Sequence, residues 1–216
     1  MLLLAVDTSG RQGGGITFAR GVGDQIEVIE SASIQGGTFS AELIPQISDL
    51  LARHQLAPRQ LQGLVAVTGP GSFTGLRVGL TAVKGLAEVL KIPIATVTSL
   101  ELLIAASGAR KGVMAVLDAG RNEVYAGIQN GSREEVLLSM HEAMALAKSR
   151  NLQVVAGEAH IAAKFERAQL VAHRSTEIAA RIGYSKLLAG ETVDVLALDA
   201  NYIRRSEAEY MQRMKK

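Results

Sequence analysis

The chain has 216 residues, of which 48% are hydrophobic and 20% are charged, a composition that excludes a disordered chain. It contains no cysteine, which rules out disulfides, a cysteine nucleophile and a thiolate zinc site. Its 23 basic and 21 acidic residues nearly balance, and aromatic residues make up only 4%. Proteins that bind nucleic acid directly usually gather more positive charge and more aromatic rings on one surface, so this composition argues against direct binding of nucleic acid.

The first segment, MLLLAVDTSG, has no basic stretch before its apolar run and carries an acidic residue at position 7. We therefore interpret it as a buried strand rather than a signal peptide. No stretch of 18 uninterrupted apolar residues occurs, so we expect no membrane span. Together these features predict a cytoplasmic protein.

The first half of the chain alternates short apolar runs with glycine-rich turns. Three consecutive strands, forming a meander, are predicted at 2–6, 15–19 and 26–32. Apolar positions spaced as on one helical face predict a helix from Ser40 to His54, with Ser40 as its N-cap. A strand, a small-residue helix and a second strand follow at 64–68, 75–90 and 94–97. This order predicts two parallel strands joined by a right-handed crossover.

The second half begins again with strands, at 113–119 and 123–129, joined by the tight turn Gly120–Asn122. Further helices are predicted at 141–150, 175–189 and 202–213. Short apolar runs occur at 153–157 and 169–172. Asp7 and Asp118 occupy similar places near the end of the first strand of each half. We interpret the halves as duplicated lobes, 1–100 and 101–216, with the last helices packing back on the first.

A glycine-rich turn, GPGSFTGLRVG at 69–79, follows one predicted strand and opens a predicted helix. Free amide groups at a helix start bind anions, so a weak nucleotide site is one interpretation; its candidate residues are Asp7, Thr8, Gly71 and Ser72. The segment matches neither a Walker A loop nor the full dinucleotide fingerprint. A helix terminus contributes about 0.3–2 kcal/mol, whereas millimolar binding needs about 4 kcal/mol. We therefore favour a second interpretation, a tight turn before a closely packed helix.

Six segments together resemble the TsaB (YeaZ) family: AVDTS at 5–9, ELIPQISDLL at 42–51, GPGSFTGLRVGLTAVKGLA at 69–87, IATVTSLELL at 94–103, VLDAGRNEVYAG at 116–127 and YIRRSEAE at 202–209. The resemblance implies an α/β fold with two lobes, of the actin-like/Hsp70-like (ASKHA) type, with duplicated mixed sheets. It implies a non-catalytic scaffold that pairs with TsaD to form N6-threonylcarbamoyladenosine beside the tRNA anticodon. The ATPase TsaE is a further implied partner, and tRNA is contacted only through the complex.

The resemblance also places the TsaD interface on the helices 40–53 and 75–89. The interface residues that we predict there are Leu43, Ile47, Thr74, Gly75, Arg77, Val78, Gly79, Ala82 and Val83. Without TsaD, a homodimer through the same helices is expected. The sequence leaves open whether Arg77 and Lys84 face solvent, a partner's carboxylates or a phosphate.

Three departures limit what can be transferred from the family. Phe39 stands where family members commonly carry histidine, and Ala200–Asn201 replaces a common proline. The paired metal histidines of TsaD have no counterpart after the strand 94–97. The histidines at 54, 141, 160 and 173 are not spaced to chelate a metal from one helix.

We therefore expect no metal and no catalytic residue, and we expect Asp118 to cap its hairpin. No nucleotide is expected to bind intrinsically, and ATP or ADP only weakly or at a shared interface. One alternative is an ATP-dependent kinase or hydrolase that uses Asp7 and the loop 69–74. Another alternative is a glycoprotease, but the sequence contains no pair of metal-binding histidines, no cysteine and no recognisable catalytic triad.

Overall fold

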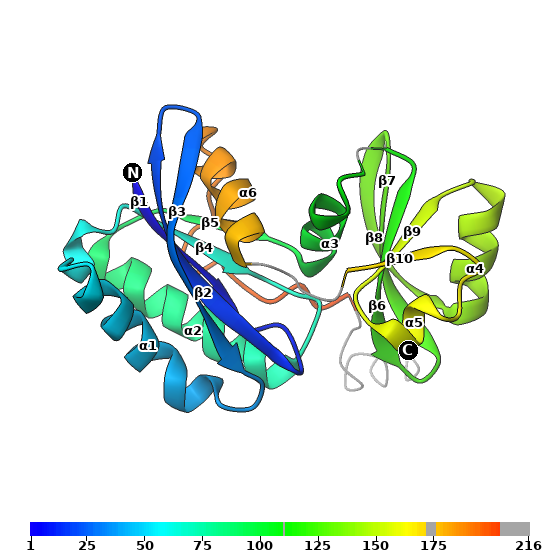
Figure 1. The fold of residues 1–216 in the computed structure, drawn as a ribbon, viewed down its shortest axis with the longest axis horizontal. Coiled ribbons are helices and arrows are strands. Elements are labelled where there is room, and N and C mark those ends of the chain that lie inside the picture. Colours follow the sequence, from blue (N-terminus) through cyan, green and yellow to red (C-terminus); the bar gives the residue numbers. More distant parts are fainter. Residues whose placement is uncertain (110, 172–175, 204–216) are drawn as a thin grey trace, which may run out of the picture.

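The computed structural model describes residues 1–109, 111–171 and 176–203, which form two lobes (Figure 1). The first lobe contains a five-stranded mixed sheet in the order β3-β2-β1-β4-β5. Its strands are β1 (Leu2–Asp7), β2 (Gly13–Val22), β3 (Gln25–Gln35), β4 (Gly63–Val67) and β5 (Ile94–Val97). The first three form an antiparallel meander, and β4 and β5 are parallel to each other, as the sequence predicts; both also run parallel to β1.

Helices cover both faces of this sheet (Figure 1). One face packs against α1 (Phe39–Arg53) and α2 (Phe73–Leu90), with the short 3-10 helix η1 (Pro58–Gln60) between them in sequence. The other face is covered by α6 (Thr176–Leu188), which contacts β1, β2, β4 and β5 although it comes late in the chain. Both faces are buried, which explains why β4 is apolar throughout and fully buried.

The second lobe repeats this arrangement with the sheet order β10-β9-β6-β7-β8. Its strands are β6 (Val113–Gly120), β7 (Glu123–Asn130), β8 (Ser132–Ser139), β9 (Gln153–Ala156) and β10 (Ala168–Leu170). One face packs against α3 (Ser99–Ser107), and the other against α4 (Met140–Ser149) and α5 (Ala159–Ala162). Helix α3 lies beside the first lobe as well, since it also contacts α6.

The two lobes have the same connectivity, which confirms the predicted duplication: an antiparallel meander comes first, and two parallel strands follow. The matching aspartates also make matching turns. Asp7 Oδ1 accepts a hydrogen bond from the amide of Ser9 at 2.8 Å, and Asp118 Oδ1 accepts one from the amide of Gly120 at 2.7 Å. The prediction that Asp118 caps its hairpin is therefore confirmed.

Some predicted elements differ from the structure. Ser40 is not the N-cap of α1, because the helix already begins at Phe39 after Thr38, and the side chain of Thr38 makes no capping bond. Helix α3 and strand β8 were not predicted. Each is short, and the charged residues of β8 hide its alternation. The predicted tail helix lies outside the described residues from position 204 onward, and so does His173.

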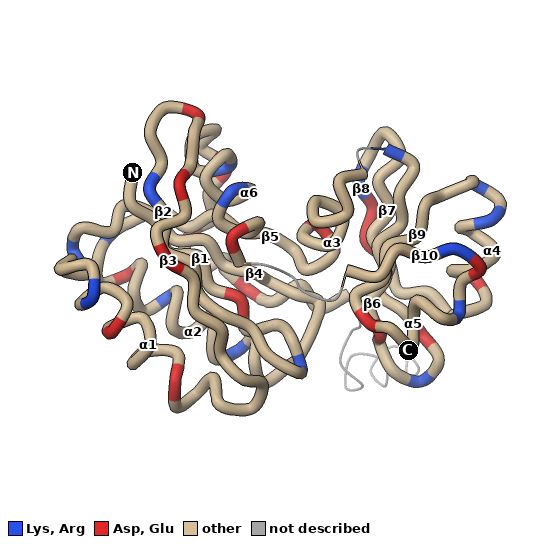
Figure 2. The backbone as a smooth tube through the Cα atoms, viewed as in Figure 1, with Lys and Arg blue, Asp and Glu red and all other residues tan. Residues whose placement is uncertain are grey.

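Charged residues of both signs are spread over both lobes (Figure 2). This distribution agrees with the near balance of 23 basic and 21 acidic residues. Among the described residues, no helix has the length and apolarity that crossing a bilayer requires.

One surface cluster predicts how stability changes with pH. Glu30 on β3 lies beside Arg53 Nη2 at 2.5 Å and His54 Nε2 at 2.7 Å, and these hydrogen bonds, that of Arg53 first, hold the pKa of Glu30 below its ordinary 4.5. A carboxyl whose pKa is lower in the folded state stabilises the fold above its unfolded pKa, and this contribution disappears as pH falls through the folded value. Glu30→Gln should therefore flatten the loss of stability on acidification from about pH 6 to about pH 3.

Thermal unfolding across this range measures the effect, with Glu27→Gln on the same strand as the control. An acid profile for Glu30→Gln that matches the parent chain would show that the cluster does not contribute.

Candidate functional site

The glycine-rich loop connects β4 to α2 and is bonded to neighbouring segments on both sides. Gly69 has a φ of +95°, a conformation that favours glycine, and its carbonyl accepts the amide of Ser99 at 2.7 Å. The amide of Ser72 donates to the carbonyl of Ser9 at 2.7 Å. Ser72 also caps α2, because its hydroxyl accepts the amide of Gly75 at 3.3 Å. The loop is thus held against the turn after β1 and the start of α3.

Three glycines let α2 lie directly on that turn. A Cβ atom at Gly71 would come within 2.2 Å of the carbonyl oxygen of Ser9. A Cβ at Gly75 would come within 2.1 Å of the carbonyl oxygen of Thr8, and one at Gly79 within 2.1 Å of Thr8 Oγ1. The hydroxyl of Thr8 donates to the carbonyl of Gly75 at 2.7 Å, in a buried position. Close packing within the chain therefore accounts for the small residues at the start of α2.

The structure brings the four candidate nucleotide residues together, yet most of their polar groups bond within the chain. Asp7 and Thr8 are each only 2% exposed, Ser72 is partly buried, and Gly71 is exposed. The hydroxyl of Thr8 and the amide and hydroxyl of Ser72 all have partners inside the protein. A phosphate cradle needs such groups to point outward. The geometry therefore favours the turn-and-packing interpretation of this loop.

The predicted partner interface needs a correction. Five of its residues are buried inside the first lobe and cannot contact another protein: Leu43, Ile47, Gly75, Gly79 and Val83. The physical reason is that the small-residue side of α2 faces the sheet, where Thr8 lies against it. Thr74 and Arg77 are exposed, and Val78 and Ala82 are partly exposed. A larger residue at position 79 would therefore disrupt the packing of α2 on Thr8.

The solvent-exposed side of α1 and α2 carries other residues than the buried ones just described. On α1 the exposed positions Ala41, Ile44, Pro45, Ser48 and Ala52 share one helical face, and none is charged. On α2 one face contains Thr74, Val78, Ala82, Gly85 and Val89, again without a charge. Ile44 is 54% exposed and Val89 is 80% exposed. We refer to these ten residues as the uncharged face.

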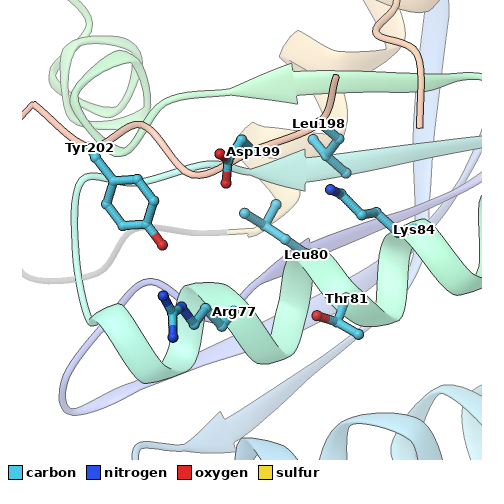
Figure 3. Close-up of a pocket in the computed structure, with 7 residues that line it drawn as sticks. All are labelled: Arg77, Leu80, Thr81, Lys84, Leu198, Asp199 and Tyr202. Carbon is cyan, nitrogen blue, oxygen red and sulfur yellow. The ribbon is translucent and has the colours of Figure 1, made fainter. Parts of the chain in front are cut away.

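A pocket of about 240 Å³ lies on another side of α2, against the segment 198–202 (Figure 3). Arg77, Thr81 and Lys84 contribute polar groups from the helix, and Asp199 and Tyr202 contribute them from the segment. Sequence analysis named Arg77 and Lys84 without assigning them a role. The segment 198–202 was not expected to lie beside α2, because nothing in the sequence signals that contact.

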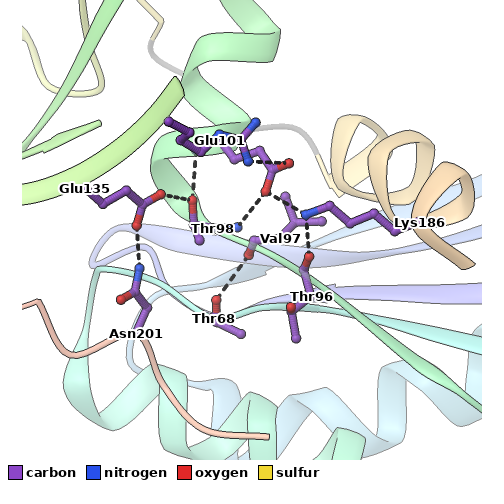
Figure 4. A network of polar contacts seen from close by, with 9 residues as sticks. Thr68, Thr96, Val97, Thr98, Glu101, Glu135, Lys186 and Asn201 are labelled. Carbon is purple, nitrogen blue, oxygen red and sulfur yellow. Dashed lines mark hydrogen bonds and ion pairs between the residues drawn. The ribbon is translucent and has the colours of Figure 1, made fainter. Parts of the chain in front are cut away.

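A polar network joins the two lobes (Figure 4). Glu101 on α3 is 5% exposed; one of its carboxylate oxygens lies 2.9 Å from Lys186 Nζ of α6, and the other lies 2.8 Å from Arg133 Nη1 of β8. Glu135 on β8 accepts hydrogen bonds from the hydroxyl of Thr98 and the side-chain amide of Asn201. Helix α6, strand β8 and the segment that contains Asn201 are thereby tied to the start of α3.

Sequence analysis did not predict this network, although one signal was available. Thr98 and Glu101 form a capping box, in which each side chain bonds the backbone amide of the other residue. The Thr-x-x-Glu spacing is a recognised helix start and would have predicted α3. The cations on β8 and α6 could not be predicted, because only the packing of the lobes brings them to Glu101.

At the end of β6, Asp118 has polar neighbours of its own. His160 Nε2 lies 3.3 Å from Asp118 Oδ2, and Glu158 accepts the amide of Asp118 at 3.3 Å. Within the described parts of the chain, three or more histidine, aspartate or glutamate side chains nowhere converge as a metal site would require. The cluster at Asp118 is accounted for by the hairpin turn.

Comparison with known proteins identifies the family. The family model described as "TsaD: tRNA N6-adenosine threonylcarbamoyltransferase" matches residues 33–198, well over half of the chain. The Bacillus subtilis "tRNA threonylcarbamoyladenosine biosynthesis protein TsaB" is 36% identical over 141 residues, 63% of this chain and 60% of that protein. The chain belongs to the family that this model describes, and TsaB proteins are among its curated relatives. The TsaB protein of Haemophilus influenzae is 32% identical over 58% of this chain and 52% of its own length.

A solved structure of a TsaB/YeaZ member shows the same fold. YeaZ from Pseudomonas aeruginosa superimposes with a TM-score of 0.75 at 24% identity, covering 94% of this chain and 100% of that one. The fold is therefore that of YeaZ, an α/β fold with two lobes that each contain a mixed sheet, as the resemblance implies. In sequence, the match spans about 60% or less of the curated TsaB relatives.

Proposed function

We propose that this chain acts in tRNA threonylcarbamoyladenosine biosynthesis as a non-catalytic subunit that pairs with TsaD. Similarity to curated TsaB proteins supports the pathway, because these relatives are named for that biosynthesis. TsaE is the further partner in this proposal, and tRNA reaches the chain only through the complex. The alternative, a kinase or hydrolase that uses Asp7, finds little support because the Asp7 carboxyl is only 2% exposed.

The observation that carries the pairing is the uncharged face of α1 and α2. Cores of protein interfaces are depleted of charged residues, whereas free surfaces of soluble proteins are rich in them. Here two helices that pack side by side expose ten uncharged positions, and two of them, Ile44 and Val89, are large apolar side chains. Leaving such a surface in water is unfavourable, so the uncharged face is suited to a protein partner. When TsaD is absent, the same face pairs two copies of this chain.

Ile44→Asp should weaken association with TsaD by about tenfold or more, because burying one unpaired carboxylate in an apolar interface costs at least about 1–3 kcal/mol. Binding of purified TsaD, followed by calorimetry, measures the change. Val22→Asp serves as the matched control, since Val22 is also apolar and 73% exposed but belongs to β2. The same two variants, tested by analytical ultracentrifugation, report on the homodimer.

The proposal also predicts the activity of the reconstituted system. The chain should turn over no ATP by itself, and it should support tRNA threonylcarbamoylation only when TsaD and TsaE are added. ATP turnover by the chain without these proteins would contradict the non-catalytic role. Undiminished TsaD binding by Ile44→Asp would place the interface elsewhere.

A further inference from the structure

The pocket beside α2 has walls that are fixed by the fold (Figure 3). Leu80 and Leu198 are buried and contribute its apolar part. The segment that carries Asp199 and Tyr202 is held in place at Asn201, whose amide donates to the carbonyl of Thr68 at 2.8 Å. The side chain of Asn201 also bonds Glu135 of the second lobe. A pocket with such anchored walls is organised before any ligand arrives, which lowers the cost of binding.

Aromatic rings position the side chain of Arg77 at one end of this pocket. The guanidinium carbon of Arg77 lies 3.9 Å from the ring centroid of Phe73, and that ring lies 5.7 Å from the ring of Tyr202. Phe73 is 54% exposed and Tyr202 is 42% exposed. A guanidinium that stacks on a ring keeps the N–H groups at its edge free to donate. Arg77 is therefore held in a conformation that can bind an oxyanion.

The two cations of the pocket, Arg77 and Lys84, form no ion pair within the described part of the chain. Neither Arg77 nor Lys84 lies within 4.0 Å of an acidic group there. Asp199 is the acidic residue among those lining the pocket, and one of its oxygens already accepts the amide of Ala200 at 2.7 Å. Two cations and one carboxylate leave a net charge of about one positive unit.

We propose that this pocket receives the side-chain carboxylate of an aspartate or glutamate of the protein partner. The inference rests on the proposed function, because it assumes a partner bound to the uncharged face, and the pocket opens on the same helix. A carboxylate matches one net positive charge, whereas a phosphate carries about −1.5 to −2 and would leave excess negative charge in the pocket. Exposed arginine, tyrosine and other aromatic side chains around a pocket are also typical of the residues that dominate protein interfaces.

The test uses the full chain and purified TsaD. Arg77→Ala should weaken TsaD binding by about tenfold or more, and it should reduce the dependence of affinity on salt, because one charge pair is lost. Lys84→Ala should act in the same direction. Arg59→Ala is the matched control, since Arg59 is exposed on η1 and does not line the pocket. Unchanged thermal unfolding of each variant would show that the fold is intact.

Two results would overturn the inference. The first result is that Arg77→Ala and Lys84→Ala bind TsaD with the same affinity and the same salt dependence as the parent chain. If Ile44→Asp still loses binding, that result leaves the proposed function standing, whereas a parent chain that does not bind TsaD contradicts the proposed function itself. The second is binding of inorganic phosphate or ATP to the isolated chain, measured by calorimetry and lost in Arg77→Ala, which would assign the pocket to a small phosphorylated ligand.

Discussion

Replacing Gly75 with alanine should lower the free energy of unfolding by about 3 kcal/mol, at the upper end of what overpacking usually costs. The added Cβ would come within 2.1 Å of the carbonyl oxygen of Thr8, a backbone atom at the end of a central strand. A flexible side chain could move aside, but this carbonyl cannot shift without displacing the turn after β1. The helix would therefore have to lift away from the sheet, with loss of the bond from Thr8 to Gly75.

The same helix offers a matched control for this prediction. Gly85 is exposed, and nothing lies within 4 Å of a Cβ atom placed there. Gly85→Ala should stabilise the protein by about 0.5–1 kcal/mol, the usual advantage of alanine over glycine within a helix. Urea denaturation of the two variants compares them directly. Equal stabilities for Gly75→Ala and Gly85→Ala would mean that close packing on Thr8 does not constrain α2.

Replacing Glu101 with glutamine should cost about 3 kcal/mol of stability, because removing one member of a buried ion pair leaves the other charges uncompensated. Lys186 loses its carboxylate partner while its side chain is only 23% exposed, and Arg133 loses its partner in the second lobe. Glutamine has the same shape, so the packing around α3 is retained and the loss reports on charge. The contacts between the lobes should loosen as well.

The control is a glutamate whose ion pair lies in solvent. Glu88 on α2 pairs with Lys91, the residue directly after the helix, where both side chains are largely exposed, and such pairs contribute little. Glu88→Gln should therefore change stability by less than about 1 kcal/mol. Urea denaturation gives the free energies, and amide hydrogen exchange at the start of α3 reports on the lobe contacts. Faster exchange there in Glu101→Gln than in Glu88→Gln is expected, and equal exchange would argue against a role in joining the lobes.

Most secondary structure could be predicted because local chemistry determines it. The periodicity of Leu43, Ile47 and Leu50 gives α1, and the continuous apolar runs give β4 and β5. Elements with weak periodicity were missed: α3 is almost uniformly apolar and buried, and β8 is rich in charge. The signal for α3 was the spacing of its capping box, and the signal for β8 was its correspondence to β3 in the duplicated first lobe.

The candidate sites were predicted less well than the secondary structure. The sequence identified α1 and α2 as important, but it assigned the interface to residues such as Gly79 and Leu43, which are buried. A small residue on a helix is equally suited to packing against its own sheet or against another protein, so composition does not distinguish the two. The direction in which each side of the helix faces is decided by the turn at Thr8, which lies far away in sequence.

The sequence by itself determined the family, the duplicated aspartate turns and the glycine-rich helix start, because each depends on short segments with specific chemistry. The tertiary structure decided which faces of α1 and α2 meet water, which cations reach Glu101, and that residues 198–202 complete a pocket with Arg77. The physical reason is that burial and ion pairing depend on contacts between segments distant in sequence, such as Glu101 and Lys186, which are 85 residues apart, and no local pattern records them.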